Sequence, residues 1–225
     1  DGTEAEKSGN GLRIFAAYLL RLGEVRAGER FTVETPGGVV TMEILEERPD
    51  SLLVEVEMGH ASFHSADVGL RGPDHTVDGE MLELESGARV TITAVSLGNP
   101  HCVVFSDTLH PAELREIAPE ISTHPAFERG TNVQFARAVA PAAVEAWVWE
   151  RGAGETLASG SSACAVAAAA VRRGLVSERL VEVRMPGGAL HVTVGDDFSL
   201  TLRGPVEVVY EGELAEEMVR RLGEG

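Results

Sequence analysis

The segment from Ser159 to Gly174 reads SGSSACAVAAAAVRRG, and the segment from Ser8 to Gly23 has the same length and reads SGNGLRIFAAYLLRLG. Both begin with Ser-Gly, contain Ala-Ala in an apolar body, and end with Arg and Gly. A serine in the N-cap position and a glycine that can adopt a left-handed cap are typical helix boundaries. The pair predicts one helix used twice, each about 24 Å long at 1.5 Å per residue.

The second of these helices has no polar face, because every residue from Ala163 to Val171 is apolar. A helix of this kind is normally buried in the centre of its domain. The first helix is only slightly more amphipathic. We therefore expect each helix to form the core of one domain.

The sequence after each helix repeats as well. Pro-Gly-Gly occurs at 36–38 and again at 186–188, and this combination is typical of a hairpin turn. Apolar and polar residues alternate around both turns, which predicts half-buried antiparallel strands. The expected strands after the helices are Val40–Ile44, Val54–Met58, Leu190–Val194 and Leu200–Leu202, and those before the second helix are Val90–Thr93, Cys102–Phe105 and Val144–Val148.

This order predicts an α+β fold of two pseudo-symmetric domains, each a mostly antiparallel sheet wrapped around a central buried helix. Residues 1–88 would form the N-terminal domain and residues 89–203 the C-terminal domain. The first copy lacks the strands that precede the second helix, so we expect about sixty further residues ahead of Asp1. Residues 204–225 would complete the first domain with a strand at 204–212 and a short helix at 214–222.

Composition excludes several classes of protein. Hydrophobic residues make up 44% of the chain and no apolar run is long enough to span a membrane. The formal net charge of −17 opposes binding to nucleic acid and to anionic membranes, which leaves small molecules as the expected partners. A cytoplasmic location is the default expectation for such a chain. A homodimer is a common state that the sequence leaves open.

Lysine and cysteine usage limits the chemistry further. Lys7 is the only lysine, so a pyridoxal phosphate Schiff base has just one candidate, and we expect no cofactor. Cys102 and Cys164 lie in apolar contexts without metal-ligand spacing, which indicates packing roles and no metal site.

Two helix N-termini of similar design offer two sets of free backbone N–H groups, which suit a carboxylate ligand. In a pseudo-two-fold arrangement Ser8 and Ser159 would approach one ligand from opposite sides. One serine could then remove a proton from one face while the other returned a proton to the opposite face. Equally, both serines could be simple helix caps.

Three polar clusters interrupt apolar strands: GNPH at 98–101, RGTN at 129–132 and ERGAGET at 150–156. Each alone is more typical of a turn than of a site. Together with DGTEAEKSGNG at 1–11 and ASGSSACA at 158–165, they resemble the diaminopimelate epimerase family in order, spacing and residue identity across essentially the whole chain.

The resemblance implies a cofactor-independent amino-acid epimerase that interconverts LL- and meso-diaminopimelate, a step of lysine biosynthesis, in the cytoplasm. It places the substrate between the two domains. His101 would tune or orient a catalytic group, and Ser8 and Ser159 fall where the family has its two catalytic cysteines. The substrate would be held by Gly9, Asn10, Asn99, Asn132, Glu150, Arg151, Gly160 and Ser161.

The serines are the main departure from the family pattern. A thiol near a helix N-terminus can ionise and exchange a Cα proton, whereas a hydroxyl is far less acidic and needs an adjacent base. Ser162 also stands where the family usually has glycine. We therefore expect impaired turnover. The alternatives are a related lyase or dehydratase and a non-catalytic amino-acid-binding module.

Overall fold

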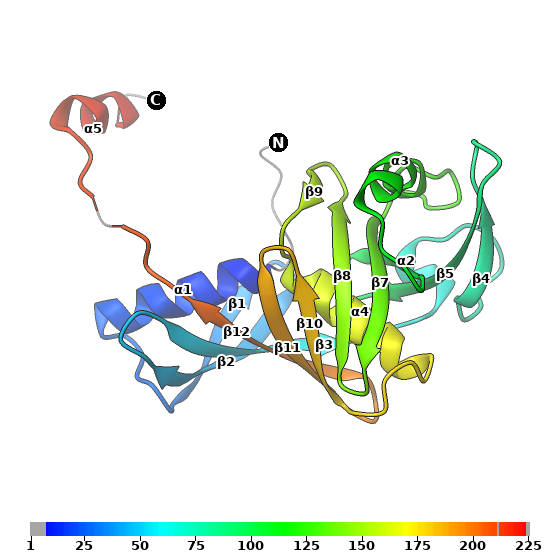
Figure 1. The fold of residues 1–225 in the computed structure, drawn as a ribbon. Helices are drawn as coiled ribbons and strands as arrows, with labels where there is room; N and C mark the ends of the chain where they lie inside the picture. The colour runs from blue at the N-terminus through cyan, green and yellow to red at the C-terminus, as the bar shows by residue number, and fades with distance from the viewer. Residues whose placement is uncertain (1–7, 211, 224–225) are drawn as a thin grey trace.

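The computed structural model describes residues 8–210 and 212–223 (Figure 1). Its helices are α1 (Gly9–Leu22), α2 (Ser65–Val68), α3 (Pro111–Ser122), α4 (Gly160–Arg172) and α5 (Glu216–Leu222). Its strands are β1 (Arg30–Thr35), β2 (Gly38–Glu47), β3 (Leu52–His60), β4 (Asp78–Glu83), β5 (Arg89–Ser96), β6 (Pro100–Phe105), β7 (Asn132–Ala140), β8 (Ala143–Glu150), β9 (Gly154–Thr156), β10 (Leu180–Met185), β11 (Gly188–Val194) and β12 (Ser199–Val206).

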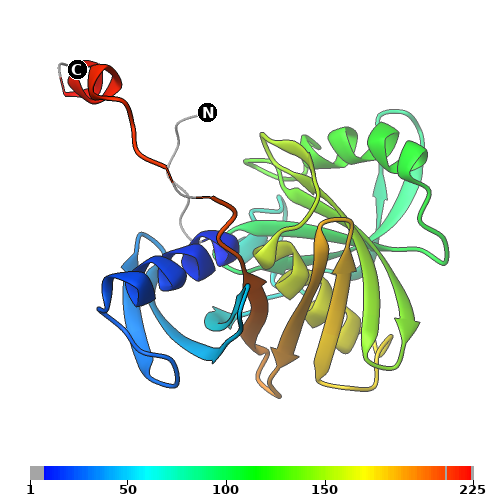
Figure 2. The same cartoon turned by 60° about the vertical axis from the view of Figure 1, so that its left-hand side comes forward.

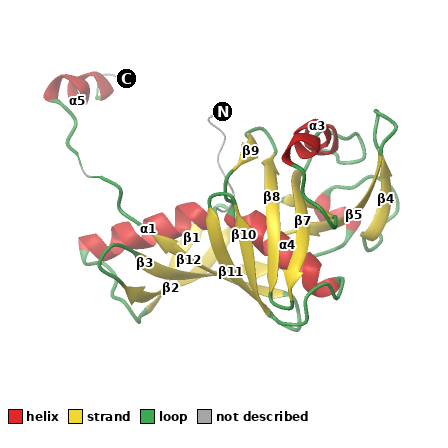
Figure 3. Ribbon diagram, in the orientation of Figure 1, coloured by secondary structure: helices red, strands yellow, loops and turns green. Residues whose placement is uncertain are grey.

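The described strands form one continuous sheet, in the order β1-β2-β3-β12-β11-β10-β8-β7-β6-β5-β4, with β9 paired to β8. The pairs β6–β7 and β8–β10 are parallel and the other pairs are antiparallel. The sheet curls around α4, which packs against β5, β6, β7, β8, β10, β11 and β12, while α1 lies on β2, β3 and β12 (Figure 3). The predicted α+β fold with sheets wrapped around central helices is confirmed.

The two predicted helices form within a residue or two of their expected ends. Ser8 is the N-cap of α1 and Gly23 its left-handed C-cap, with φ of 75°. In α4 every residue from Ser162 to Ala170 is buried, as its uniformly apolar sequence predicts. Small alanine side chains let the surrounding strands approach the helix axis closely, so this helix acts as the core of its half of the sheet.

Both Pro-Gly-Gly segments form the predicted hairpins. Thr35 pairs with Gly38 across the first turn, and Met185 pairs with Gly188 across the second. The seven predicted strands are all present. The equivalence of the two hairpins, each following its helix, agrees with the internal repeat.

The tail differs from its prediction. The predicted 204–212 strand, of which residue 211 lies outside the described part, ends at Val206 in β12. Glu207–Tyr210 form no strand, because no strand of the described residues lies beside them to pair with. The short terminal helix is confirmed as α5, which lies apart from the sheet (Figures 1 and 2). The domain division at residue 88 and the completion of the first domain by 204–225 stay predictions.

Two further sequence expectations concern the cysteines and membrane spans. Cys102 and Cys164 are both fully buried, which agrees with the packing role that their apolar contexts predict, and burial raises the pKa of the Cys102 thiol. Among the described residues, no helix has the length and apolarity that crossing a membrane requires.

Candidate active site at two helix N-termini

The N-termini of α1 and α4 meet at their first residues (Figures 1 and 2). A Cβ atom built on Gly160 would lie 3.0 Å from the Cα atom of Gly9, and one built on Gly9 would lie 3.2 Å from the Cα atom of Gly160. Side chains at either position would force the two backbones apart. The Ser-Gly that opens each repeat therefore serves a close approach, and Ser8 and Ser159 directly precede the two glycines that are in contact.

The two serines differ in what their hydroxyls do. Ser8 is exposed, and its Oγ accepts a hydrogen bond from the backbone N–H of Gly11 at 3.1 Å, so it caps α1. Ser159 is only 5% exposed and makes no side-chain cap bond. Its Oγ lies 3.5 Å from that of Ser161. The capping interpretation thus describes Ser8, whereas the hydroxyl of Ser159 is not used as a cap.

The electrostatics of the helix pair favour an anion. The first N–H groups of a helix have no intrahelical acceptor, and the helix dipole adds positive potential there. Arg13, one turn into α1, is 7% exposed and donates to the carbonyl of Gly9 at 3.1 Å and to Oδ1 of Asn10 at 3.0 Å. Burial lowers the pKa of its guanidinium. Sequence reasoning missed Arg13, whose only signal is a charged residue among the apolar residues in the first half of α1.

Asn10 joins the two helix starts. Its Nδ2 donates to the carbonyl of Ala158 at 3.3 Å, directly before Ser159, while its Oδ1 accepts from Arg13. The loop ahead of Ser159 is also held from the other side, since the N–H of Gly187 donates to the carbonyl of Leu157 at 2.7 Å. The chain that carries Ser159 is thereby fixed between α1 and the β10–β11 turn.

A second group of predicted residues gathers at one end of β6, β7 and β8. The parallel register pairs His101 with Asn132. Nδ2 of Asn132 donates to the carbonyl of Pro100 at 3.0 Å, and its Oδ1 accepts from the N–H of Arg151 at 3.0 Å. The guanidinium of Arg151 donates to the carbonyl of Arg129 at 3.0 Å. The three polar clusters of the sequence are thus brought together.

Glu150 ends β8 and is half-buried, and the guanidinium of Arg151 donates to the carbonyl of Arg129 rather than to Glu150. Ser161 is half-buried in the first turn of α4, beside the buried Gly160. Asn99 is half-buried and its Oδ1 lies 3.1 Å from Nε2 of His101.

His101 is fully buried, and both ring nitrogens have partners. Besides Asn99 at Nε2, the Nε2 amide of Gln134 lies 3.1 Å from His101 Nδ1, and the same amide donates to Oγ of Ser162 at 3.0 Å. Neither serine at the helix N-caps is among its described hydrogen-bond partners. His101 therefore connects Asn99 to the first turn of α4 rather than contacting Ser8 or Ser159. Gln134 was also missed from the sequence.

Burial makes His101 a source of acid sensitivity. Loss of hydration lowers its pKa to about 3, against about 6.5 in an unfolded chain. Between about pH 6.5 and pH 3, His101 is protonated in the unfolded chain and neutral in the folded chain. As the pH falls from about 6.5 to about 3, the free energy of unfolding should decrease by up to about 1.4 kcal/mol per pH unit. Above about pH 6.5 His101 should not affect it.

Urea denaturation at a series of pH values from 7.5 to 4.5 measures this slope. His101→Gln should flatten it, whereas His110→Gln, on an exposed loop position, is the matched control. An unchanged slope in His101→Gln would show that other groups carry the acid sensitivity.

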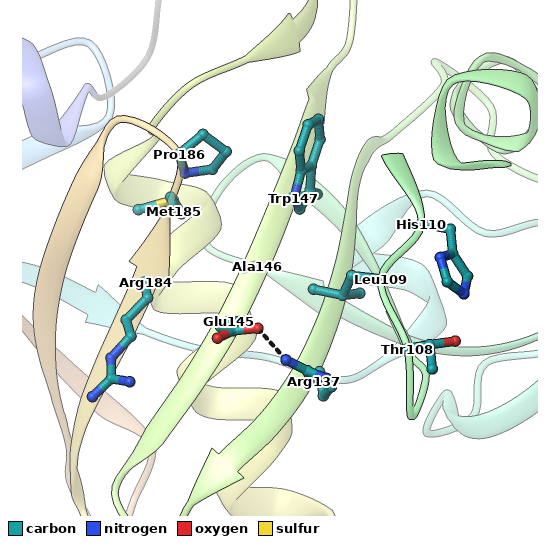
Figure 4. A pocket seen from close by; sticks show the side chains of 10 residues that line it. All are labelled: Thr108, Leu109, His110, Arg137, Glu145, Ala146, Trp147, Arg184, Met185 and Pro186. Carbon is teal, nitrogen blue, oxygen red and sulfur yellow. Dashed lines mark hydrogen bonds and ion pairs between the residues drawn. The ribbon is translucent and has the colours of Figure 1, made fainter. Parts of the chain in front are cut away.

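A pocket of about 460 Å³ lies on the outer side of the sheet, over β7, β8 and β10 (Figure 4). Arg137 and Glu145 line it and form a 2.6 Å ion pair with each other, and Trp147 and Pro186 form part of its wall. None of the predicted site residues lines it. This pocket is therefore separate from the helix pair.

The family model described as diaminopimelate epimerase matches residues 1–64 and 93–209. The chain belongs to the diaminopimelate epimerase family. Similar curated members are diaminopimelate epimerase 2 of Nostoc sp., 41% identical over 97% of this chain and 74% of its own length, and the diaminopimelate epimerase of Pelotomaculum thermopropionicum, 43% identical over 95% and 75%.

Solved structures with the same fold include a hydroxyproline epimerase from Agrobacterium vitis with bound trans-4-hydroxy-L-proline, at a TM-score of 0.65 and 18% identity over 90% of this chain and 66% of that one. A predicted epimerase from Pseudomonas aeruginosa gives a TM-score of 0.59 at 18% identity over 89% and 73%. Membership of the epimerase family agrees with the paired helix N-termini, and it makes the two serines at their N-caps the feature that needs a functional account.

Proposed function

We propose that this chain is a cofactor-independent epimerase of diaminopimelate whose proton transfer is slowed by serine at both catalytic positions. The observation that carries the proposal is the contact between Gly9 and Gly160, which sets two similar helix N-termini against each other with one serine at each. The choice of diaminopimelate as the substrate rests on the relatives named above, which are diaminopimelate epimerases.

Binding would rest on the helix N-termini. The free N–H groups of Gly9, Asn10, Gly160 and Ser161 would hold the α-carboxylate, with the buried positive charge of Arg13 behind them. Asn99, Asn132 and the pair at 150–151 would hold the remaining amino and carboxylate groups.

Catalysis would require one serine to take the Cα proton while the other donates a proton to the opposite face. Serine lacks the acidity for this role, and neither hydroxyl has a described bond to His101 that would activate it. Ser8 is further committed to the N–H of Gly11. Slow exchange is the expected consequence, with binding retained.

The test is incubation of the chain with LL- and meso-diaminopimelate in deuterated water, followed by mass spectrometry of the amino acid. Slow entry of deuterium at Cα from both isomers, with interconversion, is the expected result. Loss of water or ammonia would replace the proposal with a lyase. Tight binding without any exchange after days would replace it with a binding module. Cytoplasmic location and a homodimer stay predictions, the second of which size-exclusion chromatography with light scattering checks.

A further inference from the structure

Gln134 lies at the centre of a buried chain of side chains that runs from Asn99 through His101 to Ser162. The exposed fraction is 0% for His101 and Gln134 and 1% for Ser162. The links are 3.1 Å from Asn99 Oδ1 to His101 Nε2, 3.1 Å from His101 Nδ1 to Gln134 Nε2, and 3.0 Å from Gln134 Nε2 to Ser162 Oγ. The last link depends on the hydroxyl of Ser162.

The orientation of the Gln134 amide, that is, which end is the NH₂ group and which the oxygen, follows from its partners. As placed, its two N–H groups meet two acceptors, and only Oε1 is left buried without a partner among the described residues. Turning the amide by 180° would bury an NH₂ group with two unpaired donors instead. An unpaired carbonyl oxygen is the less costly arrangement.

This orientation of the Gln134 amide determines the tautomer of His101. A nitrogen that accepts from Gln134 carries no proton, so Nδ1 is bare and the proton of the neutral imidazole sits on Nε2. Nε2–H then donates to Asn99, and only the Oδ1 end of that amide can accept. The NH₂ end of Asn99 is left free as a donor.

We propose that Gln134 is a positioning residue which, through the tautomer of His101, makes Asn99 present N–H donors to a carboxylate of the ligand. The ligand in this statement rests on the function proposed above, whereas the tautomer does not. With the opposite tautomer Asn99 would present its oxygen, which repels a carboxylate. The side chain of Gln134 would thus select an anionic over a cationic group at this position without touching it.

The first arm of the test needs no ligand. Nitrogen-15 NMR of histidine distinguishes a protonated from a bare ring nitrogen, and the His101→Gln variant assigns the signals among the seven histidines. We expect Nε2–H in the unaltered chain and in Ser162→Ala, which keeps the Gln134–His101 bond. In Gln134→Glu the carboxylate can only accept, so the proton should move to Nδ1. Nδ1–H in the unaltered chain, or an unchanged tautomer in Gln134→Glu, would overturn the proposal.

The second arm measures binding of meso-diaminopimelate by calorimetry. Gln134→Glu and Asn99→Asp should both weaken binding by about tenfold or more, because each turns a carbonyl-type oxygen toward the carboxylate. Gln134→Met, which keeps the shape without a donor, should leave the ring a mixture of tautomers and weaken binding less than Gln134→Glu. Should the unaltered chain bind no diaminopimelate, the proposed function fails while the NMR arm still decides the tautomer. Equal binding by all variants would overturn the link from Gln134 to the ligand.

Discussion

Replacing Ser8 and Ser159 together with cysteine should raise the rate of Cα deuterium exchange into diaminopimelate by about 10²- to 10⁴-fold. A free thiol ionises near pH 8.5, and a helix N-terminus lowers that value, so thiolate becomes available at neutral pH. Both positions lie at such N-termini, beside the contact between Gly9 and Gly160. Mass spectrometry of diaminopimelate in deuterated water measures the rate.

The single variants separate the two faces. Ser159→Cys loses no cap, because the Ser159 hydroxyl makes none, whereas Ser8→Cys gives up the bond to Gly11 and should cost about 1 kcal/mol of stability. Each single variant should gain far less exchange than the double variant, since one face still lacks a base. Ser177→Cys, which adds an exposed thiol away from the helix pair, is the control and should gain nothing. A double variant no faster than the Ser/Ser chain would show that these positions do not face the Cα proton.

Gly160→Ala should nearly abolish binding of diaminopimelate and lower the free energy of unfolding by about 1–3 kcal/mol. The new methyl group would meet the Cα atom of Gly9 at 3.0 Å and Cδ2 of Leu202 at 3.0 Å. The first of these is backbone and cannot rotate away, so the two helix N-termini must separate. Calorimetric titration with meso-diaminopimelate and urea denaturation measure the two effects.

Gly11→Ala is the matched control, because its methyl group would meet only the side chain of Ser8, at 3.3 Å, and alanine favours the helix. It should leave both measurements within a small margin of the unaltered chain. Binding that survives in Gly160→Ala would mean that the ligand does not depend on the close approach of the two helices.

The sequence predicts the parts of this fold that its repeat and its alternation encode. The two helices, both Pro-Gly-Gly hairpins and seven strands follow from local patterns that carry their own caps and turns. The sequence pattern predicts no helix or strand between Ser106 and Thr131, and this segment contains α3, whose sequence includes Pro119 inside the helix. Strand β7 was hidden because its first residue, Asn132, belongs to a polar cluster that resembles a turn.

The wrong strand in the tail shows the limit of local pattern. Val208 and Val209 suit a strand by type, but a strand forms only beside a partner, and the pairing of β12 with β3 ends at Val206. Likewise, Gln134 joins the site through contacts with residues that other elements bring beside it. Nothing in the neighbouring sequence marks Gln134, whose partners are 33 and 28 positions away.

The central claim is that the two helix N-termini frame one site for a diaminopimelate molecule. Calorimetric titration of the unaltered Ser/Ser chain with LL- and meso-diaminopimelate tests it most directly. We predict one molecule bound per chain and comparable affinity for the two isomers, since similar groups face the ligand from both helices. The absence of binding heat for both isomers, or binding that is unchanged in Gly160→Ala, would contradict the claim.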